Sequence, residues 1–162
     1  CEDRKSVIYK QERVGINQSI FTVYKLRTMK LNSESGNPIW ASKLDSRITK
    51  IGKILRKLRI DELPQLICVI KGEMSLVGPR PHAIQHNEYY RKLITGYMQR
   101  HSKLPGMTGL AQINGFRGET NSVEIMRKRV ELDINYNNNW SLIKDFHILL
   151  KTLFIVLNGK AY

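Results

Sequence analysis

Cysteine is scarce in this chain, and the usual disulfide and metal patterns are missing with it. The two cysteines, Cys1 and Cys68, cannot build a disulfide framework, and no CxxC pair or histidine cluster suits zinc. No nucleotide loop of the GxxxxGK[ST] or GxGxxG kind, no internal repeat and no low-complexity tract occurs. The sequence therefore argues against a disulfide-stapled domain and a Rossmann sheet, and it indicates a reducing compartment.

Long apolar runs and acidic residues are also in short supply. The sequence has no uncharged apolar run of about 18 residues and no signal peptide, so we expect that this chain alone neither is exported nor spans a bilayer. Only 14 acidic residues oppose 27 lysines and arginines, which gives a net charge of +13. Such a field attracts nucleic acid, anionic lipid or phosphorylated small molecules. With 162 residues, 41% of them hydrophobic, we expect one domain with its own core and an anionic partner.

The densest chemistry lies between Ile60 and Pro81. Asp61 and Glu62 precede a series of apolar residues at helical spacing, so we expect a helix to begin at this pair, with Asp61 as its N-cap. The positive end of the helix dipole would favour ionised carboxylates, and an ionised aspartate is a usable nucleophile. The alternative is that Asp61 only caps the helix and Glu62 is a solvated acid.

A short strand followed by a stiff loop is predicted at the end of this stretch. The apolar run ends at Gly78, and Pro79 and Pro81 flank Arg80. Two prolines lower the entropy that the arginine loses on binding, and its planar fork suits a phosphate. Arg80 is therefore a candidate phosphate ligand, although Pro-Arg-Pro is as typical of a surface turn.

A β-hairpin is predicted near the start of the chain. Residues 7–11 and 20–24 are rich in β-branched and aromatic side chains, and residues 15–18 form the turn. Lys25 and Arg27 follow at a spacing of two, which places both on one face, where they bind a phosphate or remain solvated.

Helices and loops are predicted for the rest of the chain. Residues 46–59 form a strongly basic amphipathic helix and residues 140–157 the most apolar one, and each could lie on an anionic membrane or serve as an ordinary surface or core helix. The other expected elements are a loop at 31–44, helices at 82–100 and 122–136, a turn-rich loop at 104–109 and a strand at 110–114. His82 and His86 could share a helical face as metal ligands, but no third ligand is in register.

These elements predict an α+β fold, a small antiparallel β-hairpin or sheet surrounded by amphipathic helices, with one face associated with a membrane. The strand signals are too few for a doubly wound sheet, and the active site is expected at the start of the Asp61 helix.

Four sequence blocks occur in one order and together cover nearly the whole chain. They are KLRTM at 25–29, DELPQL at 61–66, GEMSLVGPRP at 72–81 and PGMTGLAQ at 105–112. The series resembles the bacterial sugar transferases, the monotopic phosphoglycosyl transferases. Residues 115–120, with 129–133 and 139–142, look most like the undecaprenyl-phosphate glucose or galactose phosphotransferase branch, which favours hexose 1-phosphate.

The resemblance implies transfer of a sugar 1-phosphate from a UDP-sugar to polyprenyl (undecaprenyl) phosphate at the cytoplasmic face of the bacterial inner membrane, as the first step of glycan assembly. It implies that Asp61 attacks the β-phosphate and releases UMP, while Glu62 helps to hold Mg²⁺. It places Lys25, Arg27 and Arg80 near the phosphates and Arg117 near the end of the site. A carboxylate nucleophile divides the transfer into two steps, and a metal neutralises charge in each.

The chain departs from the family at its beginning. Members carry an apolar membrane-dipping helix before the first hairpin, and this chain begins without it and without Met. We therefore expect residues 1–162 to be a single sugar-transferase catalytic domain from a longer protein, held at an anionic membrane surface by the basic and C-terminal helices. A homo-oligomer is left open.

Two other classes remain as alternatives. A basic nucleic-acid-binding module fits the charge, but no recognition motif occurs and the acid pair would repel a phosphate backbone, so no nucleic acid is expected. A catalytically silent membrane-surface scaffold is the other.

Overall fold

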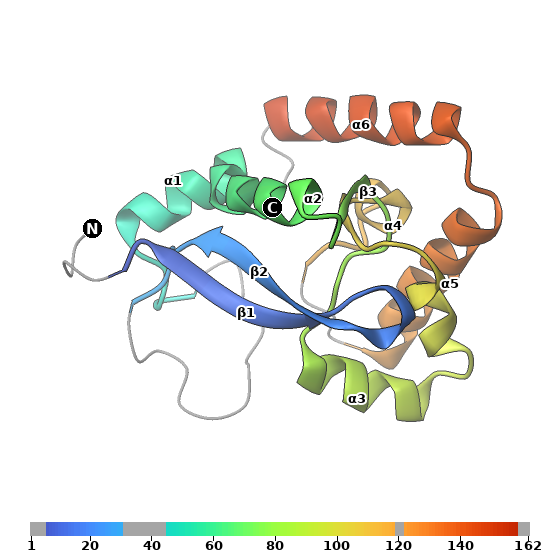
Figure 1. The fold of residues 1–162 in the computed structure, drawn as a ribbon. Coiled ribbons are helices and arrows are strands. Elements are labelled where there is room, and N and C mark those ends of the chain that lie inside the picture. The colour runs from blue at the N-terminus through green and yellow to red at the C-terminus, as the bar shows by residue number, and fades with distance from the viewer. Residues whose placement is uncertain (1–5, 31–44, 119–121, 159–162) are drawn as a thin grey trace.

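The protein is described by a computed structural model that covers residues 6–30, 45–118 and 122–158 (Figure 1). The strands are β1 (Ile8–Val14), β2 (Ile20–Leu26), β3 (Ser75–Val77) and β4 (Gly106–Thr108). The α-helices are α1 (Lys50–Leu58), α2 (Leu66–Ile70), α3 (Ile84–Leu93), α4 (Leu110–Ile113), α5 (Val123–Asn138) and α6 (Leu142–Leu157). Short 3-10 helices cover Ile16–Gln18, Ile60–Gln65 and Tyr97–Ser102. This mixture confirms the predicted α+β class, and the loop predicted at residues 31–44 lies outside the described ranges.

The predicted hairpin is confirmed, with longer strands than the sequence indicated. β1 and β2 pair antiparallel, and Tyr9 faces Lys25 across the pair. Phe21 and Val23 are buried against Cys68 and other apolar residues of the segment that contains α2. Because side chains alternate along a strand, Lys25 lies on the same face as Phe21 and Val23, at the end of that small core.

The short strand predicted before Gly78 is confirmed as β3, and it pairs in parallel with β4 in a second sheet that the sequence did not predict. The prediction of a strand at residues 110–114 is wrong, since α4 begins there, and the strand lies in the segment predicted as a loop. Gly106 permits the pairing, because a Cβ at this position would lie 2.1 Å from the backbone nitrogen of Gly78. The Gly106 backbone N–H also donates to the carbonyl of Pro79 at 2.9 Å, so β4 holds the start of the Pro-Arg-Pro loop.

The predicted helices around the acid pair need correction. α1 begins at Lys50 rather than at residue 46, because Thr49 caps it by accepting from the Gly52 N–H at 2.9 Å. The chain then turns at Arg59, whose φ of 63° is left-handed, and enters the 3-10 helix. Asp61 is therefore not an N-cap, and the α-helix that follows is only Leu66–Ile70.

The C-terminal half packs helices around a second core. Residues predicted as one helix at 82–100 form α3 and the 3-10 helix Tyr97–Ser102, separated at Gly96 with a φ of 75°. Tyr90 and Tyr97 pack here against Met126 and Val130 of α5, whose start after Ser122 is as predicted.

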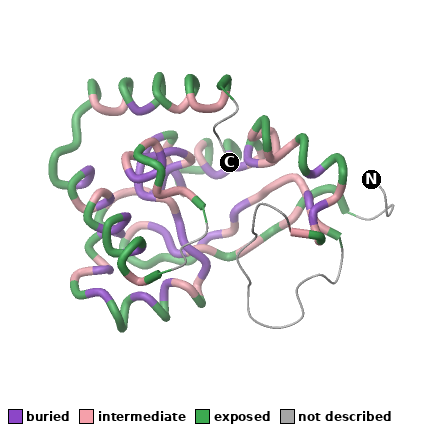
Figure 2. Tube along the Cα trace, turned by 180° about the vertical axis from the view of Figure 1, so that it is seen from behind, coloured by how far each residue is buried: buried purple, intermediate pink, exposed green. Residues whose placement is uncertain are grey.

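Helix α6 lies along one edge of the molecule, on the same side of the hairpin as α1 and α2, and α3 lies on the opposite side (Figure 1). Ile148 packs α6 against Val77 and Tyr136, while most of its surface is exposed (Figure 2). Within the described ranges, no helix combines the length and the apolar character needed to cross a membrane.

Candidate active site

The carboxylate of Glu62 lies at the centre of four cationic side chains. Lys25 Nζ lies 2.8 Å from Oε1, and nitrogens of Arg59 and Arg117 lie 3.3 and 3.5 Å from Oε2. Arg80 donates to both oxygens, at 3.4 Å to Oε2 and in a shorter contact to Oε1. These groups come from β2, the turn after α1, the loop after β3 and the loop after α4. The fold thus brings together Lys25, Glu62, Arg80 and Arg117, which the resemblance had placed at the site.

Glu62 is ionised in this environment. Its residue surface is only 8% exposed, and burial by itself would raise the pKa of its carboxyl. The charges of Arg80 and Lys25 and the hydrogen bond from Arg80 outweigh burial and hold the pKa well below its usual range. Four cations contact the Glu62 carboxylate, and even with the neighbouring Asp61 counted the cluster keeps an excess of positive charge that favours a polyvalent anion.

Asp61 lies beside this cluster and is half-buried. Burial and then the Glu62 charge raise its pKa, against the opposing charges of Lys25, Arg56 and Arg59. The expected effect of a helix dipole is therefore wrong, because the pair sits in a six-residue 3-10 helix. Successive residues of a 3-10 helix point about 120° apart, so Asp61 and Glu62 face different directions.

Arg27 follows the end of β2, where its backbone N–H donates to the carbonyl of Val7 at 2.8 Å. Its predicted role as a phosphate ligand stays a prediction.

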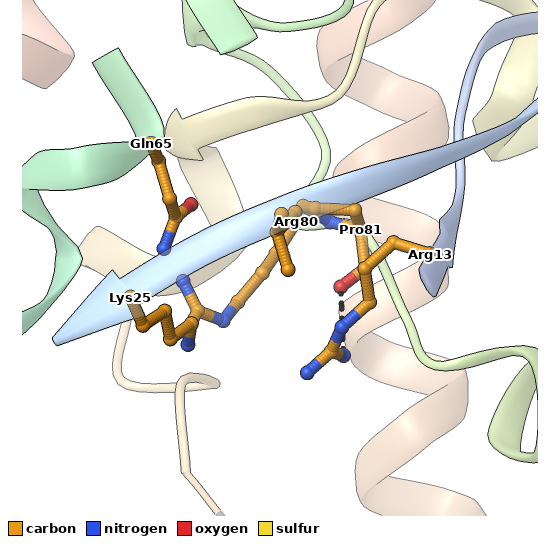
Figure 3. Close-up of a pocket in the computed structure, with 6 residues that line it drawn as sticks. Arg13, Lys25, Gln65, Arg80 and Pro81 are labelled. Atoms are coloured by element: carbon orange, nitrogen blue, oxygen red, sulfur yellow. Dashed lines mark hydrogen bonds between the residues drawn. The ribbon is translucent and has the colours of Figure 1, made fainter. Parts of the chain in front are cut away.

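Sequence reasoning missed three residues at the site, Arg13, Arg59 and Gln65. A small pocket beside the cluster is lined by Arg13, Lys25, Gln65 and Arg80 (Figure 3). Gln65 is 2% exposed, points toward the ends of Lys25 and Arg80, and its Nε2 has no hydrogen-bond partner within the part of the chain that the structure describes. Residues three apart lie on the same side of a 3-10 helix. The spacing of three between Glu62 and Gln65 was therefore the one sequence signal that could have placed Gln65 at the site.

Arg13 shapes the loop that carries Arg80. It donates from β1 to the carbonyl of Pro81 at 3.3 Å, and the neighbouring Val14 N–H donates to the carbonyl of His82 at 3.2 Å (Figure 3). The far end of the hairpin therefore fixes the backbone that follows Arg80.

His82 and His86, which the sequence allowed to share a helical face, do not lie on one helix. His82 precedes α3, is 1% exposed and lies with Nδ1 2.5 Å from the Tyr97 hydroxyl, whereas His86 lies within α3. Burial, followed by the charges of Arg100 and Arg129, lowers the pKa of His82 well below its usual range. Over residues 6–30, 45–118 and 122–158, no group of three or more His, Cys, Asp and Glu side chains could hold a metal by itself.

The acid pair is nevertheless compatible with Mg²⁺ that arrives with a substrate. Mg²⁺ in proteins is commonly held by one or two carboxylates together with substrate phosphates, and Asp61 and Glu62 supply two carboxylates. Both oxygens of Glu62 accept from cationic side chains, so a metal bound to Glu62 must displace at least one of these contacts.

Comparison with known proteins shows the family to which the chain belongs. The model of the family described as bacterial sugar transferase matches residues 1–159. A Klebsiella pneumoniae protein named UDP-glucose:undecaprenyl-phosphate glucose-1-phosphate transferase is 50% identical over 157 residues, which cover 96% of this chain and 34% of that protein. An Escherichia coli (strain K12) protein of the same name is 50% identical over 155 residues, with 96% and 33% covered.

A more distant relative carries a different sugar in its name. The UDP-N-acetylgalactosamine-undecaprenyl-phosphate N-acetylgalactosaminephosphotransferase of Aeromonas hydrophila is 41% identical over 154 residues, with 94% of this chain and 36% of that protein covered. The chain thus spans about a third of the length of these curated relatives.

Two adjacent carboxylates beside clustered cations, on a mixed α+β fold, form a site whose charge suits phosphorylated ligands. The matches are specific enough to name the group. The chain belongs to the bacterial sugar transferase family, as its sequence blocks indicated, and the relatives at 50% identity belong by name to the glucose branch. Family membership favours an enzyme over the nucleic-acid-binding module.

Proposed function

We propose that this domain transfers a sugar 1-phosphate, with hexose 1-phosphate favoured, from a UDP-sugar to polyprenyl phosphate. The observation that carries the proposal is the Glu62 cluster, in which cations from four separate segments converge on the carboxylate next to the half-buried Asp61. A diphosphate is the kind of anion that this excess of positive charge binds. The names of the relatives at 50% identity support the same substrates.

The reaction proceeds in two displacements at one phosphorus. A carboxylate oxygen of Asp61 attacks the β-phosphorus of the UDP-sugar, the bond from that phosphorus to the bridging oxygen breaks, and UMP leaves with the oxygen. A phosphate oxygen of the polyprenyl acceptor then attacks the phosphosugar-aspartate, and the bond to Asp61 breaks. The carboxylate is regenerated and the product is a polyprenyl diphosphate sugar. Lys25, Arg80 and Arg117 hold the phosphate oxygens during both displacements.

Mg²⁺ is part of this proposal. Held by Glu62, with Asp61 beside it, and by the diphosphate, it would neutralise charge on the transferring phosphoryl group. In this proposal the two carboxylates have different roles. Asp61 forms the covalent bond, and Glu62 contacts the cationic side chains and the metal ion.

The direct test is incubation of the purified protein with a panel of UDP-sugars and Mg²⁺, followed by intact mass and UMP assay. We expect an adduct with the mass of one phosphosugar and release of UMP from UDP-glucose. Salt-sensitive DNA binding without turnover of any UDP-sugar would contradict the proposal.

Activity should decrease at alkaline pH because of Lys25. Burial, reinforced by the Arg80 charge and opposed by Glu62, lowers the pKa of Lys25 to about 8. Above this pH the amine is neutral and the site loses a positive charge, so kcat/KM, which reports the free enzyme, should fall as pH rises through about 8. The rate of UMP release at limiting UDP-glucose, recorded across this pH range, measures kcat/KM. Lys25→Arg, which stays charged, should remove the decrease, and an unchanged profile in that variant would refute the assignment.

We also propose that α1 and α6 form a membrane-facing surface at the cytoplasmic face of the bacterial inner membrane. Exposed apolar side chains of α1 include Ile51 and Ile54, and those of α6 include Ile143 at 84% and Phe154 at 70% exposed. Helix α1 also carries lysines and arginines next to its apolar side chains, and this combination suits an anionic lipid surface.

Vesicle flotation should therefore require anionic lipid and weaken as salt increases. Each buried apolar side chain contributes about 1.5 to 3 kcal/mol, so the pair Ile143→Ser and Phe154→Ser should reduce binding strongly. Tyr89→Ser is the control, since Tyr89 is 57% exposed on α3 at the opposite side of the molecule. Equal binding to neutral vesicles at high salt would exclude the electrostatic contribution.

A further inference from the structure

Helix α5 buries two charged side chains one turn apart. Arg129 and Asp133 are each 2% exposed, and both lie on the face of α5 that packs against the rest of the domain. Burial, followed by the Arg100 charge, lowers the pKa of Arg129 to about 10. Asp133 forms a buried ion pair with Arg100, and Arg129 donates to backbone carbonyls. A buried ion pair contributes little to stability compared with apolar residues of similar volume, so stability is a weak reason to keep the Arg100–Asp133 pair.

Arg129 holds the loop that carries Arg117. Its Nε donates to the carbonyl of Phe116 at 2.8 Å and its Nη2 to the carbonyl of Gly118 at 3.1 Å. These two carbonyls flank Arg117, whose guanidinium lies 3.5 Å from Glu62. One guanidinium fork therefore fixes both sides of a phosphate-binding residue in a loop that is rich in glycine.

Asp133 is linked through Arg100 to the loop that carries Arg80. Its Oδ2 accepts from Arg100 Nε at 3.0 Å and from Nη2, and the same Nη2 donates to the carbonyl of Arg80 at 2.7 Å. Arg100 is 1% exposed, so this chain of contacts is shielded from water. The Arg80 backbone is thus also linked to α5, through Arg100.

We propose that Arg129 and Asp133 are positioning residues, which use one helix to set Arg117 and Arg80 against the Glu62 carboxylate. The inference rests on the proposed function, because it assigns the two arginines to the phosphates of the substrate. Neither α5 residue touches the substrate. Small displacements of a binding group carry large rate costs, of about a hundredfold for 1 Å, which explains the use of two rigid buried contacts.

Arg129→Lys tests the fork. Lysine keeps the charge but lacks the planar geometry that reaches two carbonyls. We expect kcat/KM for UDP-glucose to fall about ten- to hundredfold. Arg127→Lys is the matched control, since Arg127 lies on the same helix with a side chain 51% exposed and should keep wild-type turnover.

The readout that separates positioning from simple stability is a double-mutant cycle. In an Arg117→Ala background, Arg129→Lys should cost less than about threefold more, because the group it positions is already gone. In an Arg80→Ala background, Asp133→Asn should likewise add little. Losses that multiply in full in both backgrounds would overturn the proposal, as would Arg129→Lys with wild-type kcat/KM.

A second measurement keeps this test apart from that of the proposed function. Arginine Nε–H NMR signals of Arg117 should shift or broaden in Arg129→Lys and remain in place in Arg127→Lys, whether or not the protein turns over a UDP-sugar. If the wild-type protein releases no UMP, only the proposed function is contradicted. An unchanged Arg117 signal in Arg129→Lys would refute the positioning role.

Discussion

Asp61→Asn is expected to abolish both the phosphosugar adduct and UMP release, with a loss of at least about 10⁴-fold. Asparagine keeps the size of the side chain but cannot form the acyl phosphate, so the first displacement has no nucleophile. The fold should remain, because the burial that raises the pKa of Asp61 penalises a charge that asparagine does not carry. Intact mass spectrometry and UMP assay after incubation with UDP-glucose provide the measurement.

The control for this variant is Asp45→Asn, which also removes a carboxylate that lies next to an arginine. Asp45 pairs with Arg47 in the segment before α1, so its loss should leave the adduct intact. An adduct that persists in Asp61→Asn would assign the nucleophile to another residue.

Glu62→Gln should have the second largest effect, and on stability as well as on activity. The substitution leaves Lys25, Arg59, Arg80 and Arg117 close together without the carboxylate that they share. Removal of one partner of a buried pair leaves uncompensated charge, so we expect the free energy of unfolding to fall by about 3 kcal/mol. UDP should stabilise this variant more than the wild type, because its diphosphate replaces the missing charge.

Thermal unfolding with and without UDP measures this effect, and UMP release across a Mg²⁺ titration measures the metal role. If Glu62 holds the ion, turnover of the variant should recover partly at higher Mg²⁺ concentration. A loss of turnover that does not depend on Mg²⁺ concentration would contradict the metal-binding role of Glu62. Glu88→Gln is the control, because it breaks an arginine ion pair on α3 in which both side chains are largely exposed. A melting temperature of Glu62→Gln equal to the wild type would contradict the charge argument.

The parts of the fold that the sequence predicts depend on local signals. The hairpin follows from β-branched runs around a turn, and α5 follows from helical periodicity after Ser122, whose side chain does accept from the Ile125 N–H. The segment from Gly106 to Ile113 could not be predicted in this way. Its strand exists because it pairs with residues about thirty positions earlier, and four residues of α4 are too few for periodicity to separate a helix from a strand.

The candidate site likewise contains residues that the sequence could place and residues that depend on the tertiary fold. The resemblance to the sugar transferases implied that Lys25, Arg27 and Arg80 lie near the phosphates and Arg117 near the end of the site, although no local pattern relates these residues. Arg59 joins the cluster only because its own left-handed backbone turns the chain after α1, and a non-glycine residue gives no warning of this conformation. The supporting contacts of Arg129 and Asp133 depend on helix packing, which spacing alone does not reveal.

The carboxylate of Glu62 also decides which anions can enter. Five nitrogen contacts already satisfy it, so an incoming anion must outcompete an internal ligand that is present at fixed position and without loss of entropy. Chloride or another univalent ion offers too little charge to do so. A diphosphate brings several charged oxygens at once and can share the cations with Glu62. We therefore expect the site to select polyvalent anions at cellular salt concentrations, before any contact with the nucleoside or the sugar is made.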